Sequence, residues 1–298
     1  MTDIDKLRKA QLDIAGEIKR ICDKHGIRYF LDSGSMLGAV RHQGYIPWDD
    51  DMDVGMLDGD YQRFLQVAPG ELSEAYFLDN YDTNPENGLV FSKIRLKGTR
   101  YIENKGNPNA VHSEIFVDIF PYYFISDNEL TRRLEALQMK ALTKGILSKA
   151  GYKVWKGDGW SKRLKFIPTD ILGWLLPMKT LRGWVDWLYH RHKDTARVCI
   201  HAGSCYGYWF FPVEMFDELI EVPFEGRMFP IPKRYDEFLR RAYGTDYMTP
   251  PPPEKRVTHQ IQLLDLGPYE NELGGGGPAA CRAIPTHCCS QKYKRRNS

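Results

Sequence analysis

The sequence has little that marks an exported, membrane-spanning or zinc-binding protein. Residues 1–5 are polar and include two aspartates, whereas a secretory signal begins with a basic run followed by an apolar one. The longest apolar run, Ile171 to Met178, contains Pro177 and falls well short of the roughly 20 residues that span a bilayer. Six cysteines are present without a Cys-x-x-Cys pair, so the usual zinc and redox motifs are missing. We expect a cytoplasmic location, with the inner face of the membrane as the alternative.

The chain also lacks a strong net charge. Its formal charge is +2 over 298 residues, so no global field attracts it to nucleic acid, and we expect no nucleic-acid partner. Hydrophobic residues make up 42% and charged residues 27%, which is typical of a globular protein that buries a core. This length allows one large domain or two small ones.

The hydrophobic pattern predicts mixed helices and strands. Apolar residues at helical spacing predict a helix over residues 3–25, ended by Gly26. A strand over 27–31, a turn over 32–35 and a short helix over 36–41 follow. The next predicted elements are a strand over 52–56 and a helix over 58–67 with Asp58 as its N-cap. Further strands are expected at 75–80, 89–96, 99–103 and 114–120.

The most informative segment is an acidic cluster in which four of the five residues 49–53 are aspartates. Such clusters are usually solvated loops. Here, however, Met52 and Val54 alternate with Asp51 and Asp53, as in a strand that turns two carboxylates to one face and its apolar residues to the core. Carboxylates held that close repel unless a cation lies between them, and oxygen ligands suit Mg²⁺ or Mn²⁺. Asp49 is a further candidate ligand.

Asp118 is an isolated charge in the apolar segment Phe-Val-Asp-Ile-Phe. It is either an edge-strand residue facing water or a buried carboxylate that needs a partner. If its strand lies beside residues 52–56, three carboxylates converge, which is the arrangement that holds two metal ions for an in-line phosphoryl displacement.

Several weaker candidates surround this cluster. The turn Gly34-Ser35 offers backbone N–H groups to a phosphate. Lys93 and Arg95 share one strand face that can reach phosphate or simply face solvent. Arg41 and His42 follow the Gly-Ser turn and are candidate donor contacts, and His112 is a candidate or a plain loop residue. The aromatic candidates, whose alternative role is core packing, can cage a quaternary ammonium: Tyr45, Trp48 and Tyr122.

The order Gly34-Ser35, Asp51-Met-Asp53, Asp118 resembles that of polymerase-β-type nucleotidyltransferases. More closely, Leu31-Asp-Ser-Gly-Ser-Met-Leu-Gly-Ala-Val-Arg-His and Ile46-Pro-Trp-Asp-Asp-Asp-Met-Asp resemble the LicD family of phosphocholine and fukutin-type phosphoribitol transferases. Val117-Asp-Ile-Phe-Pro121 is similar too. So are the looser matches Phe224-Glu-Gly-Arg-Met-Phe-Pro-Ile-Pro and Tyr243-Gly-Thr-Asp-Tyr-Met-Thr-Pro-Pro. The resemblance covers roughly residues 5–260.

The resemblance implies an α+β fold, with a nucleotidyltransferase core of mixed sheet and flanking helices plus a mainly helical insertion. It implies transfer of phosphocholine, or a similar phospho-alcohol, from CDP-choline or another CDP-alcohol to a sugar hydroxyl of a cell-surface glycan such as lipopolysaccharide, teichoic acid or capsule. By position, Asp51, Asp53 and Asp118 would be catalytic metal ligands, joined by Asp49. Gly34 and Ser35 would hold donor phosphate.

Four regions are expected along the chain. Residues 1–125 form the catalytic core, 126–196 a basic, tryptophan-rich helical region, 197–268 the completion of the catalytic domain, and 269–298 a disordered tail. Residues 131–193 hold five of the seven tryptophans and carry 14 Lys and Arg against 4 Asp and Glu. That composition fits peripheral contact with an anionic membrane that carries a lipid-linked acceptor. The preferred alternative is a helical domain whose tryptophans are core and whose lysines are solvated. A metal site at Cys281, His287, Cys288 and Cys289 has the wrong spacing, and a disordered tail is preferred.

Two other functions compete. A nucleotide-sugar glycosyltransferase also uses a metal-binding Asp-x-Asp but needs no Gly-Ser turn before it. A non-catalytic binding protein on the same fold is the other alternative, and the presence of all three expected aspartates argues against it.

Overall fold

The computed structural model describes residues 2–85, 88–103, 112–152, 171, 173–200, 209–256 and 261–271. Its centre is a mixed sheet in the order β1-β2-β6-β4-β3, in which only β2 and β6 are parallel. β7 and β8 extend the sheet from the second half of β6. The strands of this sheet are β1 (Phe30–Leu31), β2 (Asp53–Leu57), β3 (Tyr76–Asp79), β4 (Ser92–Leu96), β6 (Phe116–Phe124), β7 (Arg197–Ile200) and β8 (Phe210–Pro212).

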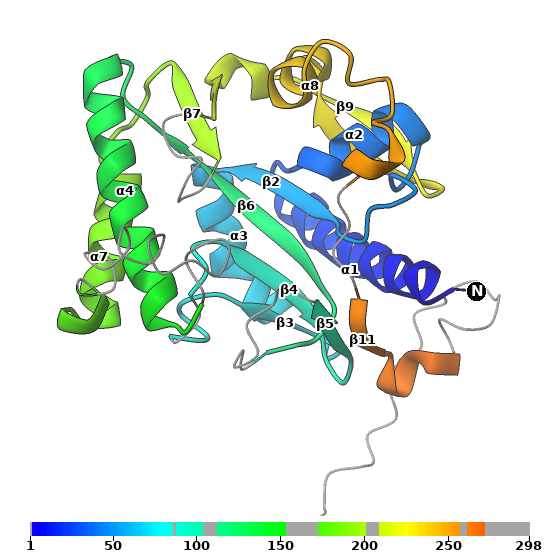
Figure 1. Ribbon diagram of the computed structural model, residues 1–298. Coiled ribbons are helices and arrows are strands. Elements are labelled where there is room, and N and C mark those ends of the chain that lie inside the picture. The colour runs from blue at the N-terminus through cyan, green and yellow to red at the C-terminus, as the bar shows by residue number, and fades with distance from the viewer. Residues whose placement is uncertain are drawn as a thin grey trace, which may run out of the picture.

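Helices flank this sheet (Figure 1). α1 (Asp3–His25) and α3 (Asp58–Glu71) contact each other and β6, so they cover one face. α2 (Ser33–His42) contacts α8 (Tyr235–Tyr243) and β9 (Leu219–Phe224), which pairs with β10 (Arg227–Pro232). β5 (Arg100–Glu103) pairs with β11 (Ile261–Asp265). A mixed sheet with flanking helices agrees with the predicted α+β class.

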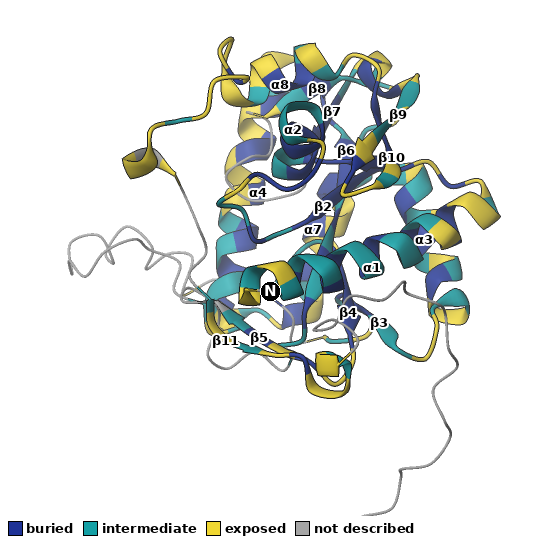
Figure 2. Ribbon diagram, turned by 90° about the vertical axis from the view of Figure 1, so that its right-hand side faces the viewer, coloured by how far each residue is buried: buried dark blue, intermediate teal, exposed yellow. Residues whose placement is uncertain are grey.

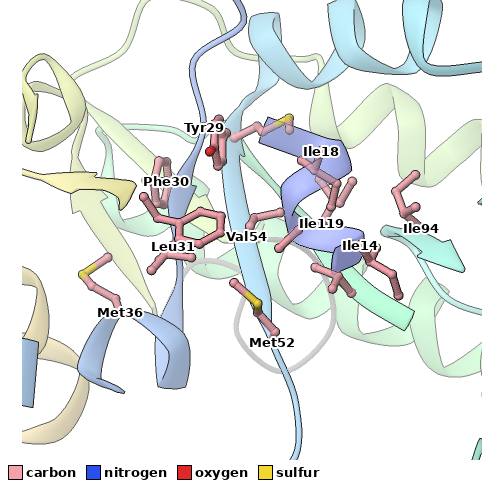
Figure 3. Packing of buried hydrophobic residues seen from close by; sticks show 14 of the residues in the cluster. Ile14, Ile18, Tyr29, Phe30, Leu31, Met36, Met52, Val54, Ile94 and Ile119 are labelled. Carbon is pink, nitrogen blue, oxygen red and sulfur yellow. The ribbon is translucent and has the colours of Figure 1, made fainter. Parts of the chain in front are cut away.

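The first helix was predicted correctly. The hydroxyl of Thr2 accepts a hydrogen bond from the backbone N–H of Asp5, whose side chain bonds back to Thr2, which forms a capping box. At the other end Gly26 adopts a left-handed conformation, with φ of 59°, which favours glycine. The fully buried Ile14 and Ile18 of this helix pack on Val54 and Ile119 of the central strands, as Figure 3 shows.

One predicted helix start and one predicted N-cap were wrong. α2 begins at Ser33 rather than near Met36, because Asp32 serves as its N-cap and accepts a hydrogen bond from the N–H of Ser33 at 2.7 Å. The predicted turn residues Gly34 and Ser35 therefore lie in the first turn of a helix. α3 is capped by Leu57, so Asp58 is a residue of its first turn, where a carboxylate still favours the helix dipole.

A second hydrophobic cluster lies beyond the end of β6. It joins the facing sides of α4 (Glu129–Lys149) and α7 (Met178–Tyr189) to Tyr123 and Ile125. Figure 1 shows these two helices side by side at the left edge, and Figure 2 shows that burial is greatest on the central strands and least on the outer turns of the helices. Residues 153–170, with Trp155 and Trp160, lie outside the described residues, and the boundaries of the four predicted regions stay predictions.

Most of the predicted disordered tail, residues 272–298, lies outside the described residues. All of the tail's cysteines fall in that part. Of its first residues, Tyr269 ends a short 3-10 helix, Gly267–Tyr269. Within the part of the chain that the structure describes, none of the helices combines the length and the hydropathy needed to cross a bilayer.

Candidate active site

The parallel pairing of β2 with β6 brings two of the predicted aspartates together. Asp53 and Asp118 are register partners across this pair, and Lys93 of β4 is the partner of Asp118 on its other side. Because side chains alternate along a strand, all three lie on one face of the sheet. Val54 and Ile119 lie on the other face and are fully buried. The strand argument for Asp53, with its apolar neighbours turned to the core, is therefore confirmed.

Asp118 forms an ion pair with Lys93 in which Nζ lies 2.5 Å from Oδ1. Only 8% of the Lys93 side chain and 13% of the Asp118 side chain are exposed. Burial raises the pKa of Asp118, and the ammonium of Lys93 opposes that rise. Lys93 also lies 3.3 Å from the ring centroid of Phe116, so the cation is held by both a carboxylate and an aromatic face.

Asp53 stands at the start of β2 and is tied to α2. Its backbone N–H donates to Oγ of Ser35 at 2.9 Å, and its C=O accepts from the N–H of Asp32 at 3.0 Å. Burial raises the pKa of Asp53 well above its usual range, and repulsion from Asp51 and Asp118 raises it further. Ser35, predicted to hold phosphate, thus contributes to positioning this carboxylate.

The loop that carries Asp49, Asp50 and Asp51 is held from α1. Arg8 donates to the C=O of Asp49 at 2.6 Å and to that of Ile46 at 2.8 Å. Asp50 is buried, and its Oδ2 accepts a hydrogen bond from the hydroxyl of Tyr101 at 3.1 Å. Asp50 is thus held by the fold, whereas Asp49 and Asp51 face a cavity.

Gly34 has a steric reason to be glycine. A Cβ at this position would lie 2.8 Å from Oδ2 of Asp49. The first turn of α2 and the Asp49 carboxylate therefore approach each other closely. A helix N-terminus stabilises negative charge, so the same place suits a phosphate or a carboxylate.

Asp32, which carried no predicted role, lies buried behind these residues. Its Oδ1 accepts hydrogen bonds from the hydroxyl of Tyr122 and the N–H of Ser33, both at 2.7 Å. Burial raises the pKa of Asp32 to about 6, against the lowering effect of these hydrogen bonds. Asp32 links α2 to β6 and, through its backbone, to Asp53.

A cavity of about 700 Å³ opens in front of the aspartates. One wall is acidic, another carries two arginines, and the remainder is aromatic or proline-rich. Its lining includes Ser33, Gly34, Arg41, Trp48, Asp49, Asp51, Asp53, Tyr243, Asp246, Tyr247, Pro250, Pro251, Pro252 and Arg256.

The two arginines of the cavity lie near the same tryptophan. The Cζ of Arg256 is 4.2 Å from the ring centroid of Trp48, and that of Arg41 is 5.8 Å away. Arg41 also donates to Nε2 of His42 and to the C=O of Tyr247. Guanidinium groups bind phosphate strongly, so this wall fits an anionic donor.

The predicted aromatic cage is not assembled as expected. Tyr45 is 7% exposed, and its hydroxyl donates to the C=O of Arg8; Tyr122 is fully buried and donates to Asp32. Of the three cage candidates, only Trp48 lines the cavity. Packing explains Tyr45 and Tyr122, since the hydrophobic sides of their rings complete the core.

Not every predicted contact reaches the cavity. Ser35, Lys93, Arg95 and Asp118 are absent from its lining. Nε of Arg95 donates to Oδ2 of Asp79 at 2.6 Å, inside the sheet. His112 lies 3.6 Å from Glu114 and packs on the ring of Phe77.

The carboxylates do not form a ready metal cluster. Among the described residues, no three His, Cys, Asp or Glu side chains are arranged so that they could hold a metal ion. The carboxylate oxygens nevertheless suit a hard divalent cation. Burial and repulsion from neighbouring carboxylates disfavour the ionised form of Asp53. A cation there would relieve that repulsion.

The residues that the motif analysis missed come from the C-terminal part. Tyr243, Asp246, Tyr247 and Arg256 line the cavity although they lie about 190 or more positions after Asp53. The segment from Tyr243 to Pro251 had been matched to the family without a role. That match was the available signal for the first three of these residues, and Arg256 had none.

Comparison with known sequences gives one family. A sequence model described as LicD/FKTN/FKRP, nucleotidyltransferase domain, matches residues 26–143. The chain is 30% identical over 266 residues to the lipopolysaccharide cholinephosphotransferase LicD of Haemophilus influenzae, a match that covers 86% of this chain and 96% of that protein.

Two further relatives match over shorter regions. The ribitol 5-phosphate transferase FKRP of Homo sapiens is 30% identical over 115 residues, which is 39% of this chain and 21% of that protein. An uncharacterized protein of Rickettsia typhi is 52% identical over 107 residues, 36% of this chain and 32% of its own length.

Proposed function

This chain belongs to the LicD family, and on that premise we propose that it is a metal-dependent phosphotransferase that moves phosphocholine, or a similar phospho-alcohol, from a CDP-activated donor to a sugar hydroxyl of a cell-surface glycan. Support comes from the Haemophilus influenzae relative, which is named as a lipopolysaccharide cholinephosphotransferase and matches over nearly its whole length. We also propose the polymerase-β-type nucleotidyltransferase fold for residues 1–125 with 197–268, and a cytoplasmic site of action.

The observation that carries the proposal is the pairing of Asp53 with Asp118 across two parallel strands, beside a cavity that Asp51 also lines. Two carboxylates in register, one buried and one partly buried, cost free energy unless positive charge compensates them. Burial, followed by repulsion from Asp51 and Asp118, raises the pKa of Asp53, and burial raises that of Asp118, as expected for a site that binds a cation during function.

We propose that Asp51, Asp53 and Asp118, with Asp49, hold Mg²⁺ or Mn²⁺. When bound, the metal supplies positive charge that neutralises a diphosphate and its leaving group. When no metal is bound, the ammonium of Lys93 partly neutralises the carboxylate of Asp118. Lys93 is close enough to Asp118 to adjust its basicity, although it does not line the cavity.

The wall of the cavity that carries Arg41 and Arg256 would bind the donor. Arg41 and Arg256 present guanidinium groups to the cavity, and the first turn of α2 at Gly34 presents backbone N–H groups. Trp48, Tyr243 and Tyr247 offer aromatic surface for the nucleotide base. The acceptor hydroxyl attacks phosphorus, the phosphoryl–alcohol group moves to it, and CMP leaves. A carboxylate of the aspartate cluster accepts the hydroxyl proton.

The test is nucleotide release by the purified protein and its Asp51→Ala variant. Each is incubated with CDP-choline, CDP-ribitol or a UDP-sugar, with Mg²⁺ or Mn²⁺. We expect slow CMP release from one CDP-alcohol, which EDTA and the variant abolish. Asp23→Asn, at an exposed position of α1, is the control.

The other outcomes identify the alternatives. Release of UDP from a UDP-sugar would show a glycosyltransferase instead. If no donor turns over, donor binding is measured by calorimetry with the metal present. Absence of metal-dependent binding would leave a non-catalytic protein on this fold.

A further inference from the structure

The outer face of α4 exposes a stripe of leucines. Leu130, Leu134 and Leu137 are 68%, 53% and 60% exposed, and their spacing of three to four residues places them on one side of the helix. The opposite side, with Met139 and Ile146, is fully buried in the second hydrophobic cluster. The helix therefore has a second apolar face that nothing among the described residues covers to any large extent.

α7 continues this surface with two tryptophans. Trp184 and Trp187 are 48% and 58% exposed and stand one turn apart. A groove of about 630 Å³ runs between the helices. It is lined by Gln138, Ala141, Leu142, Trp184, Trp187 and Leu188. In Figure 1 the two helices stand at the edge of the molecule opposite α2 and α8.

The charge around this surface is mostly positive. Described basic side chains of residues 129–193 that reach solvent are Arg133, Lys140, Lys144, Lys149, Lys179, Arg191 and Lys193. Among the described residues of the same span, the exposed acids are Glu129 and Asp186, and each lies in a salt-bridge contact, with Arg133 and His190 respectively. On α4, Lys140 and Lys144 fall beside the leucine stripe at helical spacing, and Arg191 lies over the ring of Trp187 at 5.0 Å.

We propose that this face of α4 and α7 docks on the surface of an anionic lipid bilayer. Leucines and tryptophans would enter the interfacial layer, where aromatic rings are favoured, while the basic side chains contact lipid headgroups. The helices would lie on the membrane, because none of the described helices can cross it.

The charge pattern favours a bilayer over a second copy of the chain. A symmetric dimer through this face would place the same basic patch on both partners, so like charges would oppose one another. A bilayer supplies the complementary negative charge. Docking goes beyond the proposed transfer reaction, and it needs neither donor nor metal.

The test is co-sedimentation of the full chain with vesicles of phosphatidylglycerol and phosphatidylcholine, compared with pure phosphatidylcholine. We expect binding to the anionic vesicles that falls as salt rises. Leu134→Ser/Leu137→Ser and Trp184→Ser/Trp187→Ser should each lower the partition coefficient at least tenfold. Lys140→Ala/Lys144→Ala should lower it by about fivefold for each lysine. These side chains lie at the surface, so we expect the variants to fold, and circular dichroism checks this.

Met228→Ser/Leu263→Ser is the matched control, since it removes two exposed apolar side chains elsewhere and should bind as the wild type does. The proposal is overturned if the wild type stays in the supernatant, or if the leucine, tryptophan and lysine variants sediment with the vesicles as the wild type does. It is also overturned if sedimentation equilibrium shows a dimer that the leucine variant dissociates. Donor turnover by the wild type, measured without vesicles, tests the proposed reaction separately.

Discussion

The two halves of β6 lie in regions that bury different chemistry. The first half carries Asp118 between Asp53 and Lys93, so charged groups meet inside the sheet. The second half carries Tyr123, stacked on Tyr189 with ring centroids 3.9 Å apart, and leads into the apolar core of α4 and α7. Buried carboxylates are costly and need partners, whereas stacked rings stabilise by contact alone. The first half of β6 therefore lies in the region that we propose for chemistry, and the second half lies in a region that packs.

The strongest way to test this contrast is to remove a buried carboxylate. Asp53→Asn should lower the rate of CMP release at least about a thousandfold, because the proposed charge for the metal is lost. Its melting temperature without metal should stay equal or rise, since repulsion from Asp51 and Asp118 is relieved. The measurement is nucleotide release together with thermal unfolding.

Added Mg²⁺ should raise the melting temperature of the wild type but not of the Asp53→Asn variant. Asp23→Asn, at an exposed position, serves as the control. A marked loss of stability with activity kept would show that Asp53 serves the fold rather than the reaction.

Arg95 of β4, in contrast, should matter for stability and not for turnover. Arg95 and Asp79 are buried together, with 8% and 2% of their side chains exposed. Arg95→Met removes one charge of this buried ion pair and leaves the other, so the free energy of unfolding should fall by about 3 to 5 kcal/mol. The rate of donor turnover per folded molecule should be unchanged, because Arg95 does not line the cavity.

Chemical denaturation and turnover at 15 °C measure the two effects of Arg95→Met. Arg95→Met/Asp79→Leu should recover most of the lost stability, because both charges of the pair are removed together. A rise in the donor KM of the single variant with intact folding would restore the earlier prediction that Arg95 binds donor phosphate. Lys93→Met, in contrast, should lower turnover.

Much of this arrangement could be predicted from local sequence. Gly26 and helical spacing predicted α1, and the strand pattern over residues 114–120 predicted the first part of β6, because these signals arise from neighbours along the chain. The positions of Asp51, Asp53 and Asp118 in a shared motif predicted that they belong together.

Contacts between distant segments could not be predicted in this way. Arg95 and Lys93 look equivalent in sequence. The register places Lys93 opposite both Asp79 and Asp118, and Arg95 reaches Asp79 along the diagonal. Arg256 reaches Trp48 across about 208 positions, which no local pattern indicates. α2 starts three residues before its predicted position because the side chain of Asp32 caps it.

The second hydrophobic cluster, around α4 and α7, can be destabilised by a substitution that leaves the carboxylates unchanged. Leu181 of α7 is fully buried in the second cluster, so Leu181→Ala should lower the free energy of unfolding by about 2 to 4 kcal/mol through the cavity it leaves. Turnover per folded molecule should be kept. Val54→Ala, under the aspartates, is the paired variant and should lower both stability and turnover. Equal loss of turnover in the two variants would mean that the regions are not separable.

The smallest predicted effect concerns His190, which connects the two regions. Its Nε2 lies 3.4 Å from Asp58 of α3, and this carboxylate is the main cause that raises the pKa of His190 from 6.5 to about 9. Stability from this contact is therefore complete below about pH 6.5 and is lost as pH rises through 9. Because 32% of the side chain is exposed, screening limits the effect to about 1 kcal/mol, or about 2 °C in melting temperature.

His190→Gln should melt lower than the wild type at pH 6, and the difference should vanish near pH 10. Asp58→Asn should show the same convergence. A difference that persists unchanged to pH 10 would mean that the ring of His190, packed on Tyr123, stabilises by contact rather than charge.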